Sequence, residues 1–147
     1  MKNYLSLIKF THTIFALPFA LIGVFWGLQY MEINQLALDK PWWQSLLLVI
    51  LCMVFARSAA MAFNRYQDRD IDAINERTAS REIPAGVIKP QQALAFVIIN
   101  SLLFVLATWF INSLCFFLSP VALAVILGYS YTKRFTALCH LVLGLGL

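Results

Sequence analysis

The stretch NRYQDRDIDAINERTASREIPAG, residues 64–86, carries most of the acidic charge of this chain. It holds five of the seven Asp and Glu residues and four of the eleven Lys and Arg residues. The sequence on either side of it is almost continuously apolar. Charged residues at the edge of an apolar membrane segment are costly, and they usually bind or pair with something. The fold therefore has to place this stretch at the end of a membrane helix, where a binding site can form.

The composition of the whole chain is that of a membrane protein. The chain has 147 residues, of which 61% are hydrophobic and 12% are charged, and its mean hydropathy is +0.78. A soluble domain is about half apolar and about a quarter charged. The net charge of +4 is modest, and no basic run follows the pattern of a nucleic-acid surface. We therefore expect a polytopic membrane protein with no nucleic acid among its partners.

We expect an all-α fold, a polytopic transmembrane helical bundle that forms one domain over residues 1–147. Apolar runs predict spans at about 13–30, 44–63, 93–111 and 114–131. No Pro or Gly interrupts the second helix after its span, so it should continue to about residue 75. A fifth apolar run, 137–147, reaches the last residue before it is long enough to cross a bilayer. We therefore expect the chain to be the C-terminally truncated part of a longer protein.

The distribution of basic residues predicts the orientation in the membrane. Nine Lys and Arg residues fall on the side of the N-terminal lead and the loops after the second and fourth spans, and only Lys40 falls on the other side. Cytoplasmic loops carry this excess of positive charge. We expect an integral, multi-pass protein of a bacterial inner membrane, with the N-terminus and the stretch 64–86 in the cytoplasm.

Three residues of the stretch have the spacing of a metal site. Asn64, Asp68 and Asp72 are separated by four residues each, so on a helix they share one face over about 12 Å. Two carboxylates and an amide oxygen suit Mg²⁺, which commonly bridges to substrate phosphates. The alternative is a solvated helix end at which the Asp side chains pair with Arg65, Arg69 or Arg77.

Other polar residues could extend this site. Arg57 lies within about 20° of Asn64 and Asp68 on the helical wheel, deeper in the second span, although a snorkelling or paired arginine is an equal alternative. Arg77 and Arg81 in the following loop suit bidentate phosphate contact, or are ordinary loop charges. Tyr129 and Lys133, spaced i and i+4, precede a second loop on the same side; Lys133 is either a diphosphate contact or a topological anchor.

These motifs together resemble the UbiA superfamily of intramembrane prenyltransferases, in its 4-hydroxybenzoate polyprenyltransferase-like branch. The resemblance rests on N-R-x-x-D-x-x-x-D at 64–72, R-T-x-x-R-x-x-P-x-G at 77–86, Y-x-x-x-K at 129–133 and K-F-T-H-T-I-F-A-L-P at 9–18. It covers the whole chain and implies a fold of nine helices, of which the first four to five are present. The family's second Asp-rich motif is absent from these 147 residues, and we expect this piece alone to be inactive.

The resemblance also implies an activity and its residues. It implies Mg²⁺-dependent transfer of a polyprenyl group from polyprenyl diphosphate to a small aromatic acceptor such as 4-hydroxybenzoate, in quinone (ubiquinone or menaquinone) biosynthesis, with the prenyl tail along the helices or in membrane lipid. Asn64, Asp68 and Asp72 would hold Mg²⁺, with the two carboxylates catalytic. The substrates would be bound by the same Asn64 together with Arg57, Arg77, Arg81, Tyr129 and Lys133. The competing hypotheses are a transporter that uses Asp68 and Asp72 as a cation site, and a structural membrane subunit.

Overall fold

The computed structural model describes residues 2–8, 14–36 and 40–132. Its elements are α1 (Lys2–Leu7), the 3-10 helix η1 (Ile14–Ala16), α3 (Leu17–Ile33), α4 (Trp42–Ile74), α5 (Pro90–Ile111) and α6 (Ser113–Thr132). Every regular element within the described ranges is helical, which confirms the predicted all-α class. Four segments are long and apolar enough to cross a membrane: 14–33, 42–74, 90–111 and 113–132. The predicted span at 137–147 lies outside the described residues, as does Lys133.

Proline residues explain where three of the helices begin. Pro18 lies in the first turn of α3, and Pro90 is the first residue of α5. A proline fits there because the N–H groups of the first turn have no partner within the helix. Pro41 directly precedes α4 in an extended conformation. Helix α3 therefore begins at Leu17 and ends at Ile33, a few residues later than the span predicted at 13–30.

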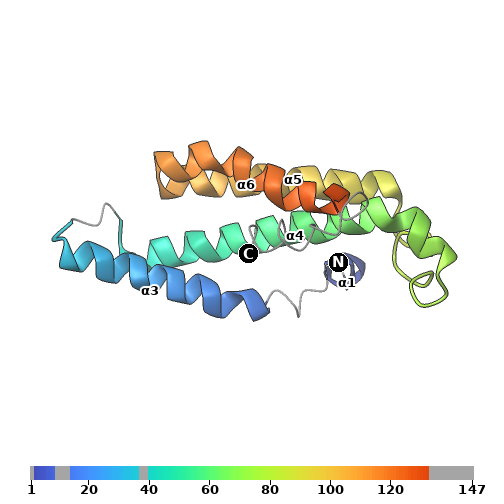
Figure 1. Ribbon diagram of the computed structural model, residues 1–147, viewed down its shortest axis with the longest axis horizontal. Coiled ribbons are helices and arrows are strands. Elements are labelled where there is room, and N and C mark those ends of the chain that lie inside the picture. Colours follow the sequence, from blue (N-terminus) through green and yellow to red (C-terminus); the bar gives the residue numbers. More distant parts are fainter. Residues whose placement is uncertain (1, 9–13, 37–39, 133–147) are drawn as a thin grey trace.

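Helix α4 is the centre of the fold. Figure 1 shows α5 and α6 along one side of α4, with α3 and α1 along the other. The contact between α4 and α5 is the most extensive in the described structure. Ala59 and Ala62 of α4 and Ala93 of α5 are completely buried there, and such small side chains allow two helix backbones to approach closely. Further along the same contact, Cys52 packs with Phe104 and Ala107.

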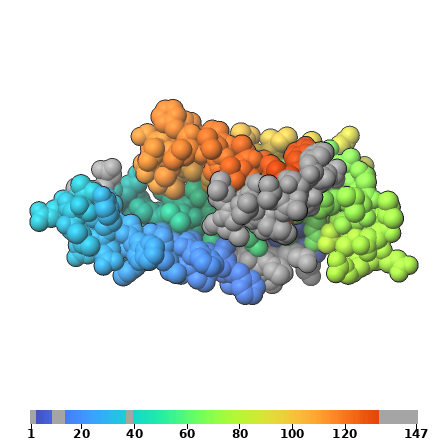
Figure 2. Space-filling model, viewed as in Figure 1, coloured from blue at the N-terminus to red at the C-terminus, as the bar shows by residue number. Residues whose placement is uncertain are grey.

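The length of α4 creates the position for a site. Its 33 residues span about 50 Å at 1.5 Å per residue, whereas the hydrocarbon core of a bilayer is about 30 Å thick. The last turns of α4 therefore extend beyond the apolar layer. The turn-rich segment 75–89 follows and forms one end of the molecule (Figure 2). Helix α1 packs under this end, where Leu7 and Ile8 are buried with Ile83 and Ile88.

Candidate functional site

The acidic side chains in the last turns of α4 lie in two environments, one covered by the fold and one exposed. Asn64 and Asp68 are half-buried, and Asp72 is only 6% exposed. Asp70 points the other way, with 79% of its side chain exposed. Since α4 is continuous from Trp42 to Ile74, the four-residue spacing places Asn64, Asp68 and Asp72 on one face. That face is the one that the fold covers.

Asp72 is held by an arginine from the following loop. Nη1 of Arg81 donates to both carboxylate oxygens of Asp72, at 2.7 Å each. The hydroxyl of Thr78 donates to the Asp72 carbonyl at 3.0 Å, so the loop is also attached to the helix backbone. Asp72 thus pairs with an arginine, but the partner is Arg81 and not Arg65, Arg69 or Arg77, the three partners that the alternative named. Arg81, which the resemblance assigns to diphosphate binding, therefore contacts Asp72 in this structure.

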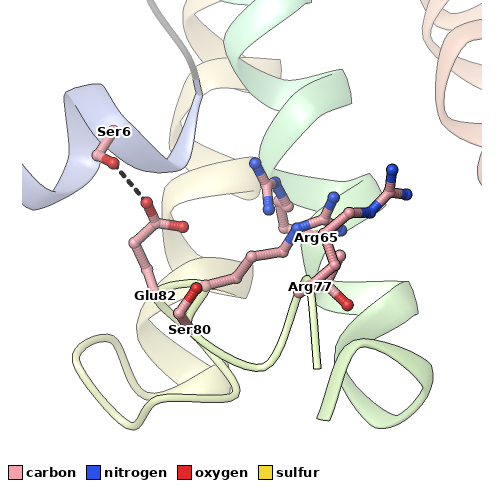
Figure 3. Close-up of a pocket in the computed structure, with 7 residues that line it drawn as sticks. Ser6, Arg65, Arg77, Ser80 and Glu82 are labelled. Atoms are coloured by element: carbon pink, nitrogen blue, oxygen red, sulfur yellow. Dashed lines mark hydrogen bonds between the residues drawn. The ribbon is translucent and has the colours of Figure 1, made fainter. Parts of the chain in front are cut away.

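A polar pocket of about 590 Å³ opens beside this ion pair. Figure 3 shows side chains from α1, α4 and the segment 75–89 around it. Its lining consists of three arginines, one glutamate and three hydroxyl residues, namely Arg65, Arg77, Arg81, Glu82, Ser6, Thr78 and Ser80. Arginine and hydroxyl donors in this combination suit an anion with several oxygen atoms, such as a phosphate group.

Arg65 is the most unusual residue of the pocket. Its side chain lies on α4 and the residue is only 8% exposed. Its Nη1 atom is buried and makes no hydrogen bond within the part of the chain that the structure describes. A buried cationic donor without an acceptor is costly, which marks it as a group positioned for a ligand. Arg65 was predicted only as a pairing partner of the Asp side chains. Its seven-residue spacing from Asp72 corresponds to about two helical turns, and this spacing could have indicated its place in the site.

Helix α1 contributes a residue that no local motif indicated. The Ser6 hydroxyl donates to Oε1 of Glu82, across 76 residues of sequence (Figure 3). The ring of Tyr4, two residues earlier, stacks on Phe96 of α5 with centroids 5.3 Å apart. The N-terminal helix is therefore fixed against the bundle and against the loop that carries Arg77 and Arg81. A contact between such distant residues could be found only in the folded structure.

Two further predicted residues lie on the helices around the site, Arg57 on α4 and Tyr129 on α6. Arg57 is half-buried two turns before Asn64, and its Nε atom is buried without a hydrogen-bond acceptor among the described residues. Tyr129 is half-buried near the end of α6. The Tyr131 ring packs on Phe63 with centroids 5.7 Å apart, which brings the end of α6 beside α4 where the Asn64 motif begins. Lys133 lies outside the described residues.

The donor set on α4 fits a hard divalent cation. Asn64, Asp68 and Asp72 offer oxygen atoms only, and Asp72 already directs both of its carboxylate oxygens at a positive group. Within residues 2–8, 14–36 and 40–132, no three His, Cys, Asp or Glu side chains lie close enough together to hold a metal ion. A cation with few protein ligands completes its shell with water and phosphate oxygens, as Mg²⁺ commonly does.

Comparisons with known proteins agree with this architecture. The model of the UbiA prenyltransferase family matches residues 16–147. The chain is 37% identical over 108 residues to a 4-hydroxybenzoate octaprenyltransferase of Aliivibrio fischeri (strain MJ11), covering 71% of the chain and 37% of the relative. It is 39% identical over 106 residues to the enzyme of that name from Janthinobacterium sp. (strain Marseille), covering 72% of the chain and 37% of the relative.

A solved structure agrees as well. The apo structure of a UbiA homolog from Aeropyrum pernix K1 superposes with a TM-score of 0.77 at 33% identity, covering 92% of this chain and 46% of that one. The chain thus spans between about a third and a half of the length of these relatives. The matched region includes the Asp-rich end of α4 and the loop 75–89, which carry six of the seven residues that line the pocket. The chain therefore belongs to the UbiA prenyltransferase family.

Proposed function

We propose that the complete protein transfers a polyprenyl group from polyprenyl diphosphate to a small aromatic acceptor such as 4-hydroxybenzoate, with Mg²⁺, in quinone biosynthesis. The observation that carries the proposal is the arginine-lined pocket beside Asp72, at the end of a helix long enough to span a membrane. Such a pocket suits a diphosphate head whose apolar tail remains among membrane helices. The names of the relatives at 37–39% identity support the choice of acceptor.

The residues in and beside the pocket would have different roles. Arg65 and Arg77 would bind phosphate oxygens, and Asn64, Asp68 and Asp72 would hold the cation. When bound, Mg²⁺ offsets negative charge on the diphosphate and so stabilises it as a leaving group. The bond between the allylic carbon and oxygen breaks with its electron pair on the diphosphate. A ring carbon of the electron-rich acceptor then bonds to the allylic carbon, and that ring carbon loses its proton to water.

The acceptor would sit deeper than the diphosphate, between the phosphate pocket and Arg57. Arg57 lies seven residues before Asn64, which corresponds to about 10 Å along α4. Its buried Nε without an acceptor suits the carboxylate of a hydroxybenzoate. The excess of Lys and Arg in the N-terminal lead and in the loops 64–90 and 132–136 supports a cytoplasmic position for the diphosphate end of the site.

The proposal is tested with the complete protein in detergent or in bacterial membranes, using polyprenyl diphosphate and 4-hydroxybenzoate. Asp68→Asn should reduce prenyl transfer by about 100-fold or more, because a metal ligand is lost. Asp70→Asn is the matched control, since that carboxylate is 79% exposed on the opposite face, and it should keep activity within about twofold. Chelation with EDTA should abolish transfer and Mg²⁺ should restore it. Full activity of Asp68→Asn would refute the metal role, and cation flux without transfer would favour a transporter.

A further inference from the structure

We propose that Arg81 is a positioning residue that exchanges with the divalent cation at Asp72. Its guanidinium occupies the position in front of the carboxylate that a cation would need. Cation binding then releases Arg81 toward the phosphate pocket. The inference rests on the proposed function only in that Asp72 is a metal ligand.

The geometry of the ion pair carries the inference. A single nitrogen, Nη1, lies 2.7 Å from both oxygens of Asp72, so it sits on the bisector of the carboxylate. A divalent cation held by this carboxylate would need the space directly in front of its oxygens. The nitrogen of Arg81 fills that space and carries a positive charge, so the guanidinium and a cation would exclude each other both by size and by charge.

Burial explains why Asp72 keeps a cationic partner. Asp72 is 6% exposed, and a buried carboxylate without a partner is strongly unfavourable. Arg81 pairs directly with Asp72, and the charges of Arg81, Glu82, Asp72 and Asp68 all act on Arg65. Arg65 belongs to the same helix as Asp72, whereas Arg81 reaches it from the loop. The guanidinium thus stabilises the carboxylate, and a divalent cation can replace it in that role.

The position of Arg81 shows where its side chain would lie after it leaves Asp72. Its side chain is 32% exposed and it lines the polar pocket, so release from Asp72 leaves it at the wall of the proposed phosphate site. Its backbone is part of consecutive turns, since its N–H donates to the Thr78 carbonyl at 3.0 Å and its own carbonyl accepts from Ala85 at 2.9 Å. Release of the side chain should therefore loosen these turns until a phosphate group holds Arg81 again.

Mn²⁺ is a suitable probe, because the electron paramagnetic resonance signal of free Mn²⁺ reports binding without any substrate. In the complete protein in detergent, Arg81→Gln should bind Mn²⁺ about tenfold more tightly than the wild type, because the competing charge is gone. Arg81→Lys keeps a competing cation and should stay near the wild type. Arg77→Gln is the matched control, since Arg77 lines the same pocket and is exposed.

A second measurement needs no variant. Hydrogen exchange of the wild-type amides of Arg81, Ala85 and Ile88, all donors in loop turns, should become faster when Mn²⁺ is added alone and slower again with inorganic diphosphate. Unchanged Mn²⁺ affinity in Arg81→Gln, or exchange that Mn²⁺ alone leaves unchanged or slows, would overturn the inference. If wild-type prenyl transfer is intact in that case, the proposed function stands. Tighter Mn²⁺ binding by Arg81→Gln with no wild-type transfer would refute the proposed function alone.

Discussion

Replacing Arg65 with methionine should weaken binding of diphosphate without weakening the fold. Arg65 is 8% exposed and lines the pocket, and its Nη1 lacks a hydrogen-bond acceptor within the described residues. A methionine fills a similar volume and brings no polar group that needs a partner. The free protein therefore loses an unfavourably buried donor, whereas the complex loses a charged contact to phosphate.

The two effects can be given magnitudes. A charge-assisted hydrogen bond contributes about 1.5–3 kcal/mol. Because Arg65 is buried, solvent screening reduces this contribution little. Loss of about 2 kcal/mol corresponds to about 30-fold weaker binding of diphosphate. The free energy of unfolding should fall by less than about 1 kcal/mol or should rise, since removing a poorly satisfied buried charge is often neutral or stabilising.

Calorimetric titration of the complete protein with inorganic diphosphate and Mg²⁺ measures the first effect, and thermal unfolding in detergent measures the second. The matched control is Arg69→Met, which removes the same charge from the same helix. Arg69 lies outside the pocket, with its Cζ 4.6 Å from the centroid of the Tyr66 ring and its Nη1 donating to the Tyr66 carbonyl. Equal affinity of Arg65→Met and the wild type, or equal weakening by both variants, would refute the role assigned to Arg65.

Three further predictions concern the loop beside the pocket and the stability of the helical bundle. Gly86→Ala should destabilise the protein by about 1 kcal/mol, because Gly86 has a φ of +73°, which an alanine rarely adopts. A Cβ atom at this position would meet no neighbouring atom, so the backbone conformation alone causes the effect. Thermal unfolding measures the change, with Gly27→Ala as the control, since Gly27 is a helical glycine that also has open space around it. Ser6→Ala removes the hydrogen bond to Glu82 and should speed hydrogen exchange of the loop, whereas Ser80→Ala in the same pocket should not. Lys40→Met should lower the free energy of unfolding by about 1 kcal/mol. The ammonium group of Lys40 donates to the carbonyls of Phe110 and Ile111 at the end of α5. An unchanged midpoint of thermal unfolding would contradict this prediction.

The sequence was sufficient for the features that depend on local spacing. The four-residue interval between Asn64, Asp68 and Asp72 predicts one helix face, and the fold covers that face while leaving Asp70 exposed. The absence of Pro and Gly between the second span and Asn75 predicts the extension of that helix, and α4 ends at Ile74. Both inferences succeed because helix geometry is fixed by rise and rotation per residue.

The sequence was insufficient where the site depends on tertiary contacts. The contact between Arg81 and Asp72 was not predicted, because it forms only when the loop folds back over nine residues to the helix end. Ser6 enters the pocket because Leu7 and Ile8 find an apolar surface beside Ile83 and Ile88. Such contacts are set by the packing of segments that are distant in sequence, and no local periodicity reports them.

The charges around the pocket also constrain how cation and diphosphate must bind. Three arginines line the pocket, and three carboxylates stand within or beside it, namely Asp68, Asp72 and Glu82. Positive and negative charges are thus balanced before any ligand binds, so the pocket has little net attraction for a diphosphate. If Asp68 and Asp72 hold the divalent cation as proposed, it would shift this balance by two positive charges and would release Arg81 as a further donor.

Binding of the two ligands is therefore predicted to be cooperative. Thermodynamic linkage requires that the factor by which Mn²⁺ raises the affinity for diphosphate equals the factor by which diphosphate raises the affinity for Mn²⁺. Titrating the complete protein in both orders measures the two factors independently, after correction for the Mn²⁺–diphosphate complex in solution. In Arg81→Gln both factors should shrink together, because the exchange at Asp72 is part of the coupling. Equal factors that Arg81→Gln leaves unchanged would assign the coupling to the cation–phosphate contact alone and would remove Arg81 from it.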